Sequence, residues 1–164
     1  MKKILISEEL ATSLHEQIGH ERFNATLYLY IASFLKNKGL NNIAKHFDGQ
    51  HDEEIGHSRM IIDLLTDLGA DVKIPQVDGC EISIGTILDI ATVYLNREIL
   101  TTESLDEIKK LSIEVGNPVV EEKIRYMISL QQKEYEEATD FSDKADILGS
   151  DWKAVLLWDA SLED

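Results

Sequence analysis

Apolar residues recur at alternating spacings of three and four along four long segments of the chain. This spacing places them on one face of an α-helix, so it predicts four amphipathic helices. The segments are separated at Gly39, Gly69 and Gly116, and the last one ends near Gly149. We therefore expect an all-α protein with helices at about residues 7–38, 41–68, 83–115 and 118–148, and a short fifth helix at 152–162.

The lengths of the links predict how these helices are arranged. The links at residues 39–40 and 116–117 are so short that each joins two antiparallel neighbours. The link at 70–82 has 13 residues, which reach about 43 Å when extended, against roughly 42 Å for a 28-residue helix. The sequence thus predicts a four-helix bundle in which a long crossover joins two antiparallel hairpins.

Every apolar stripe is interrupted by an acidic side chain about halfway along its helix. The polar residues on the stripes, in chain order, are Glu21, Glu54, His57, Glu98, Gln131 and Glu134. The first polar residue on each stripe lies about 20 Å from the start of its helix, near the helix midpoint. Reversing the direction of a helix therefore hardly changes the height of this residue along the bundle. We expect these side chains to form one polar layer at the centre of the bundle.

Such a layer requires positive charge, because each buried ion costs several kcal/mol unless it is compensated. The stripes carry no Lys or Arg at this level. Two divalent cations would cancel four carboxylates, and mixed carboxylate and imidazole ligands suit iron or a similar first-row metal. Glu54 and His57 also form the Glu-x-x-His pair that di-iron bundles point inward. The alternatives are a metal-free polar network or a wrong assignment of the stripes.

The composition supports a protein that binds cations. The 164 residues carry 16 Lys and Arg against 31 Asp and Glu, a net charge of −15, which disfavours nucleic acids and anionic membranes as partners. The single cysteine, Cys80, excludes a disulfide framework. No apolar run reaches the roughly 18 residues that a membrane helix needs. The only run that resembles a secretion signal, residues 4–6, is ended by the acids that follow it. We expect a cytoplasmic protein.

At these positions the sequence resembles the bacterial non-haem ferritins over essentially its whole length. Glu21 followed seven residues later by Tyr28 resembles the first-helix signature of that family, and residues 53–57 resemble the second. The intervals of 33, 44 and 33 residues between Glu21, Glu54, Glu98 and Gln131 are also similar to the family's. The resemblance implies a single ferritin-like domain over residues 1–164.

The resemblance also implies a ferroxidase centre, in which Fe²⁺ is oxidised at two neighbouring sites. Glu21, Glu54 and His57 would hold one iron, Glu54 would bridge, and Glu98 with Glu134 would hold the second. Three further residues are implied to complete or adjoin the site: Gln131 as a hydrogen-bonding neighbour or weak ligand, Tyr28 as a hydrogen-bonding or electron-donating neighbour, and Glu53 as a candidate ligand of a third iron. Leu130 and Lys133 stand where further acids of that third site are expected.

Two departures from related families narrow the prediction. The fourth helix lacks the second Glu-x-x-His pair of bacterioferritins and rubrerythrins, since Gln131 stands at the Glu position and Glu134 at the His position of that motif. Haem is not expected, because haem-binding relatives have a methionine where this chain has Ile55. The remaining histidines are expected at the surface, because none lies on a stripe beside a carboxylate: His15, His20, His46 and His51.

The function implied is iron storage and detoxification: oxidation of Fe²⁺ by O₂ or H₂O₂, and storage of the ferric mineral in a hollow homo-oligomeric shell of 24 subunits. Residues 152–162 would form the short helix at a symmetry axis of that shell. Three alternatives stay open: a mini-ferritin, a rubrerythrin-like peroxide scavenger, and a metal-free structural bundle.

Overall fold

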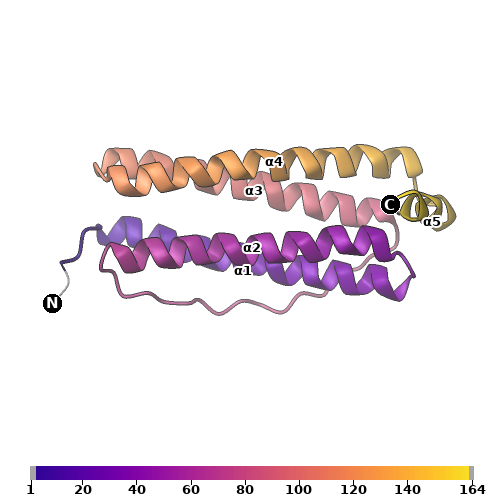
Figure 1. Ribbon diagram of the computed structural model, residues 1–164, viewed down its shortest axis with the longest axis horizontal. Coiled ribbons are helices and arrows are strands. Elements are labelled where there is room, and N and C mark those ends of the chain that lie inside the picture. Colours follow the sequence, from indigo (N-terminus) through magenta and orange to yellow (C-terminus); the bar gives the residue numbers. More distant parts are fainter. Residues whose placement is uncertain (1–2, 163–164) are drawn as a thin grey trace.

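The computed structural model describes residues 3–162, which fold into five α-helices joined by loops (Figure 1). The predicted domain of residues 1–164 therefore includes residues 1–2 and 163–164, which lie outside the described part. The helix bounds, in chain order, are α1 Glu8–Asn37, α2 Asn41–Asp67, α3 Ile87–Glu114, α4 Pro118–Leu148 and α5 Trp152–Ser161.

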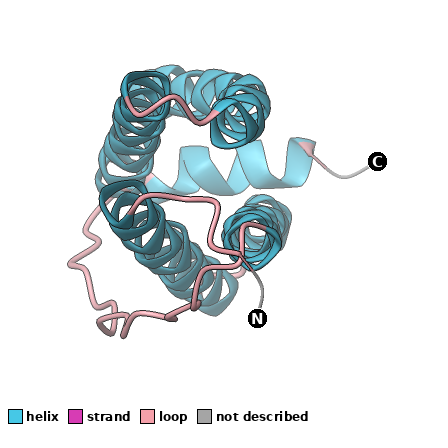
Figure 2. Cartoon of the chain, turned by 90° about the vertical axis from the view of Figure 1, so that its left-hand side faces the viewer, coloured by secondary structure: helices cyan, strands magenta, loops and turns pink. Residues whose placement is uncertain are grey.

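The four long helices form two antiparallel hairpins, α1 with α2 and α3 with α4, as the short links predict (Figure 1). The long crossover runs beside the first hairpin from one end of the bundle to the other, so α3 begins at the end where α2 began. Helix α5 lies across that end (Figure 2). Within residues 3–162, no helix combines the length and hydropathy needed to cross a membrane.

The predicted stripes form the core of the bundle. Every stripe residue that lies within a helix is buried, from Leu10 on α1 to Phe141 on α4. The apolar side chains divide into two clusters, one containing Tyr28 and Phe47 and the other containing Leu14 and Ile124. The buried glutamates, Glu21, Glu54, Glu98 and Glu134, occupy the level between these two clusters, so apolar packing closes the polar layer from both ends of the bundle.

The start of one helix differs from the prediction. Helix α3 begins at Ile87, because a capping box formed by Thr86 and Asp89 fixes its first turn there, and Ile84 stays in the loop. Helix α2 begins at Asn41 as predicted, but its N-cap residue, Leu40, provides no side-chain cap.

A carboxylate from α5 replaces the missing cap of α2. Asp159 accepts a hydrogen bond from the backbone N–H of Ile43 at 2.7 Å, and its backbone carbonyl accepts one from the Asn42 amide at 3.1 Å. The Asp159 side chain is only 5% exposed, and a negative charge at a helix N-terminus is favourable. The buried cap therefore fastens the last helix to the bundle.

We expect Asp159→Ala to lower the free energy of unfolding by about 1 kcal/mol, because it leaves a buried N–H at the start of α2 without its cap. Asp159→Asn should lose less, since asparagine caps helices about as well as aspartate. Urea unfolding measures both, with Lys153→Ala on the exposed side of α5 as the control. Equal stability of Asp159→Ala and the control would contradict this role.

Candidate metal centre

The polar residues of the four stripes meet in one layer at the middle of the bundle. Glu21, Glu54 and Glu98 are fully buried, and Glu134 is 3% exposed. Their oxygens and the nearer nitrogen of His57 fall into two groups, each with its atoms within 4.8 Å of one another: Glu21, Glu54 and His57 in the first, Glu54, Glu98 and Glu134 in the second. Glu54 belongs to both groups, so the sites are adjacent and share this carboxylate.

Neighbouring amides hold one oxygen of the carboxylates on α1 and α2. Gln17 donates to Glu21 Oε1 at 2.8 Å, and Asn24 donates to Glu54 Oε1 at 3.3 Å. The second oxygen of each, Oε2, is buried without a hydrogen-bond partner, and so is Oε2 of Glu134. Leaving a buried acceptor unsatisfied costs about 1–3 kcal/mol. These free oxygens therefore point to a cation as the missing partner.

The second group has the same character. Gln131 donates to Glu98 Oε2 at 2.6 Å, and the Tyr28 hydroxyl donates to the other oxygen of Glu98. The Gln131 carbonyl oxygen is buried without a partner, so it is available to a metal beside Glu98. His57, which belongs to the first group, also approaches the second: its Nδ1 lies 3.7 Å from Glu54 and its Nε2 lies 3.5 Å from Glu134.

Burial raises the pKa of each of these carboxyls above its usual value. It raises the pKa of Glu54 to about 8 and, with the charge of Glu98 beside it, the pKa of Glu134 to about 10. Burial also raises the pKa of Glu21 and of Glu98. Four acids that resist ionisation in the absence of a cation are typical of a site whose charge is completed by a metal.

Glu53, the candidate ligand of a third iron, lies outside both groups. It is exposed on α2, although it is close enough to Glu134 to help raise the pKa of that carboxyl. Lys133 forms an ion pair with Glu137 at 3.2 Å. This face of α4 thus offers a cation where a third iron would require another acid.

A supporting network on α1 and α3 was not anticipated from the sequence. Asn24 donates to Thr101 at 3.0 Å and accepts from Arg97 Nε at 2.7 Å. Arg97 is half-buried and lies 4.8 Å from the centre of the Phe23 ring. Arg97 brings a positive charge beside the acidic layer. The only sign of this role in the sequence is that Arg97 directly precedes Glu98.

The expectation that four histidines lie at the surface was wrong. All four are half-buried, and each has a hydrogen-bond partner. His15 accepts from the backbone of Lys73, His20 contacts Thr101 at 2.7 Å, His46 contacts the Tyr94 hydroxyl, and His51 contacts the carbonyl of Ala25. They flank the stripes, where an imidazole packs its ring inward and still reaches a polar partner.

A family model for the ferritin-like domain matches residues 11–147. The chain belongs to this family. Ferritin BfrB of Mycolicibacterium smegmatis is 28% identical over 137 residues, which cover 84% of this chain and 76% of the relative. A bacterial non-haem ferritin of Bacteroides fragilis is 23% identical over 140 residues, or 85% of this chain and 88% of the relative. These matches confirm the resemblance to bacterial non-haem ferritins.

The fold is similar to that of solved ferritins. An open pore ferritin from Archaeoglobus fulgidus superposes with a TM-score of 0.91 at 24% identity, covering 97% of each chain. The predicted ferritin-like bundle with a short C-terminal helix is thereby confirmed.

We expect the metal-free protein to lose stability as pH rises from about 5 towards 8. The unfolded chain releases these protons near the usual pKa of 4.5, whereas the folded protein keeps them, so the unfolded state binds fewer protons in this interval. Each such carboxyl contributes up to about 1.4 kcal/mol per pH unit. Denaturant unfolding across pH measures the slope.

Glu134→Gln should reduce that slope, because it removes one of the carboxyls and keeps the shape of the side chain. Glu103→Gln, on an exposed position of α3, is the matched control and should leave the slope unchanged. Stability that increases with pH in the metal-free protein would contradict the buried, protonated layer.

Proposed function

We propose that this protein oxidises Fe²⁺ to Fe³⁺ at a di-iron centre inside each bundle and stores the ferric product. The observation that carries the proposal is the set of free carboxylate oxygens in two groups that share Glu54. Oxygen ligands with one imidazole suit iron, and they favour the more highly charged Fe³⁺. Membership of the ferritin-like family supports iron storage.

The two groups suggest which residue holds which iron. Glu21 and His57 would bind the first ion, Glu98 and Glu134 the second, and Glu54 would bridge them. Gln131 would act as a weak ligand or hold Glu98 by its amide. All of these residues come from one chain, which favours this centre over the mini-ferritin type, whose iron site is built between subunits.

Tyr28 is the group best placed to take part in the redox step. Its hydroxyl donates to Glu98, and its ring is fully buried beside the layer. When O₂ or H₂O₂ accepts electrons from the iron, Tyr28 would supply a further electron and pass its proton to Glu98. We expect no haem, because Ile55 stands where haem-binding relatives have methionine.

We further propose that the chain assembles into a hollow homo-oligomeric shell, with 24 subunits as in the family it resembles. Leu156 and Leu157 on α5 are exposed, the latter at 75%, and such residues are commonly covered by a neighbouring subunit. The net charge of −15 per chain would attract iron to the assembly. Neither a nucleic acid nor a membrane is proposed as a partner, and the proposed location is the cytoplasm.

Aerobic addition of Fe²⁺ to the purified protein should produce ferric absorbance much faster than buffer does. Losing an outer hydrogen-bond partner of a ligand typically costs about 10–100-fold in metal affinity or activity, so we expect Asn24→Ala to fall in this range. Glu54→Gln and His57→Ala should lose more, since each removes a direct ligand.

Glu103→Gln, exposed on α3, is the matched control for these variants and should oxidise iron as the wild type does. Equal oxidation by wild type, Glu54→Gln and His57→Ala would contradict the site assignment. Absence of metal binding in the folded wild type would favour a structural bundle.

Light scattering of the native protein tests the proposed shell. We expect a particle near 24 × 18.6 kDa, and substitution of Leu157 by glutamate should dissociate it by burying a charge at the contact. Ala160→Glu, at another exposed position of α5, controls for the added charge. A monomeric wild type would remove the storage shell and favour the peroxide scavenger.

A further inference from the structure

A second tyrosine lies directly behind Tyr28 and contacts a histidine. The rings of Tyr28 and Tyr94 meet edge to face, with centroids 5.4 Å apart and an interplanar angle of 83°. The Tyr94 hydroxyl lies 3.2 Å from His46 Nε2, and the two rings are themselves in contact, with centroids 5.6 Å apart. Tyr94 is fully buried, so His46 is its route for proton exchange.

This pair has the chemistry that oxidation of a buried phenol requires. A tyrosine that gives up an electron becomes strongly acidic and must lose its proton, so it needs a base within hydrogen-bond reach. Burial lowers the pKa of His46, which leaves a neutral imidazole with one nitrogen free to accept. Burial raises the pKa of the Tyr94 phenol, so the proton stays on oxygen until the electron leaves.

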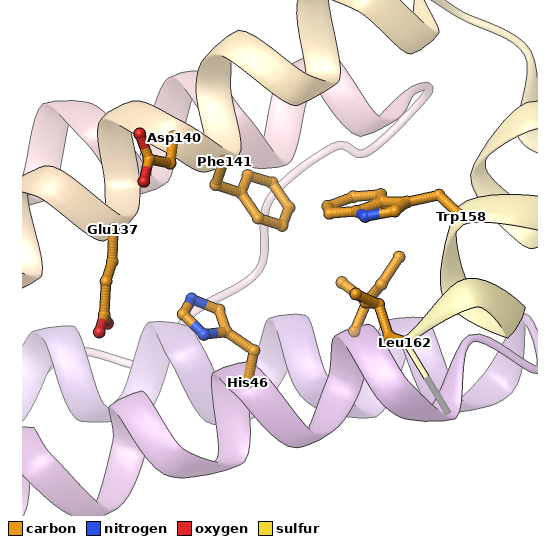
Figure 3. Close-up of a pocket in the computed structure, with 7 residues that line it drawn as sticks. His46, Glu137, Asp140, Phe141, Trp158 and Leu162 are labelled. Atoms are coloured by element: carbon orange, nitrogen blue, oxygen red, sulfur yellow. The ribbon is translucent and has the colours of Figure 1, made fainter. Parts of the chain in front are cut away.

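The surroundings of His46 allow it to hold the proton. It points from α2 into a pocket of about 420 Å³ between α2, α4 and α5, where the Glu137 side chain of α4 lies beside it (Figure 3). The imidazole is also stacked on the Phe141 ring, with centroids 6.2 Å apart and an interplanar angle of 11°. The carboxylates of Glu137 and Glu53 would stabilise the imidazolium that forms when the proton arrives, and the charge of Lys133 acts in the opposite direction.

We propose that Tyr94 and His46 form a proton-coupled redox pair that returns an electron to oxidised Tyr28. This role rests on the proposed iron oxidation and adds a second electron donor to it. Among the residues that the structure describes, Tyr94 is the tyrosine whose ring contacts Tyr28. The rings are in direct contact, and electron transfer is fastest over such short distances.

The step balances in atoms and charge. Oxidised Tyr28 is a neutral phenoxyl whose proton is on Glu98. Tyr94 then gives its electron to Tyr28 and its proton to His46, while the proton on Glu98 returns to Tyr28. The products are a Tyr94 phenoxyl, a protonated His46, a Tyr28 phenol and an ionised Glu98.

With this pair, O₂ could be reduced completely to water. Reduction of O₂ to two waters takes four electrons, and two Fe²⁺ ions supply only two. If Tyr28 is oxidised again after its repair by Tyr94, one O₂, two Fe²⁺, two phenols and two protons give two waters, two Fe³⁺ and two phenoxyls. Two further Fe²⁺ ions and two protons then restore the phenols, so four Fe²⁺ are consumed per O₂.

Freeze-quench electron paramagnetic resonance of the full-length protein, mixed with Fe²⁺ and then O₂, tests the proposal. Labelling with ring-deuterated tyrosine identifies tyrosyl signals. We expect two tyrosyl signals in sequence in the wild type, and loss of the later one in Tyr94→Phe with a longer-lived Tyr28 signal. His46→Gln retains a polar side chain but no base, and it should also lose the later signal.

Tyr30→Phe is the matched control, since this half-buried tyrosine on α1 bonds the Ile82 carbonyl at 3.1 Å, away from the pair. It should leave both signals unchanged. The consumption ratio gives a second readout: Tyr94→Phe should shift from four towards two Fe²⁺ per O₂ and release H₂O₂. The proposal would be overturned if Tyr94→Phe kept the later tyrosyl signal and the wild-type ratio of Fe²⁺ to O₂. It would also be overturned if the later radical were located on Trp158.

Pulse radiolysis of the metal-free protein separates this proposal from the ferroxidase proposal. One-electron oxidation by azide radicals should leave the final radical on Tyr94 in the wild type, and should fail to do so in Tyr94→Phe and His46→Gln. A final radical that is unaffected by both substitutions would overturn the pair whether or not the protein oxidises iron. Failure of iron oxidation with an intact Tyr94 radical would instead count against the proposed ferroxidase centre alone.

Discussion

The rest of the structure depends on one constraint: four carboxylates lie at the centre of the bundle without a buried lysine or arginine among them. Ionised together, they would repel one another in a region from which water is excluded. Burial therefore holds their protons, and the free oxygens of Glu21, Glu54 and Glu134 stay without a partner. Two divalent cations would balance the charge of the four carboxylates and contact their free oxygens. The layer therefore indicates a metal-binding site.

The fold supports this layer from both sides. Two apolar clusters close it along the bundle axis, and the amides of Gln17, Asn24 and Gln131 each bond one oxygen of a carboxylate. Rigid helices and bonded amides hold the ligands in place before any metal arrives, which reduces the ordering needed on binding. The aromatic cluster next to the layer contains Tyr28 and Tyr94, the two phenols of the proposed redox steps.

The sequence predicted those parts of the structure that follow from periodicity. The stripes, the hairpins and the common level of the acids depend on helix geometry, which is regular over thirty residues. The start of α3, the cap from Asp159 and the contacts of Asn24 and His46 depend on which side chains meet across helices. Such contacts have no periodic signal, so the four histidines that flank the stripes were assigned to the surface although each has a hydrogen-bond partner on another segment.

Anomalous diffraction from crystals of the protein prepared anaerobically with Fe²⁺ tests the central claim most directly. We predict two iron peaks in each chain, one among Glu21, Glu54 and His57 and the other among Glu54, Glu98 and Glu134, with Glu54 contacting both. Iron found only on exposed acids such as Glu53, with no peak in the buried layer, would contradict the account.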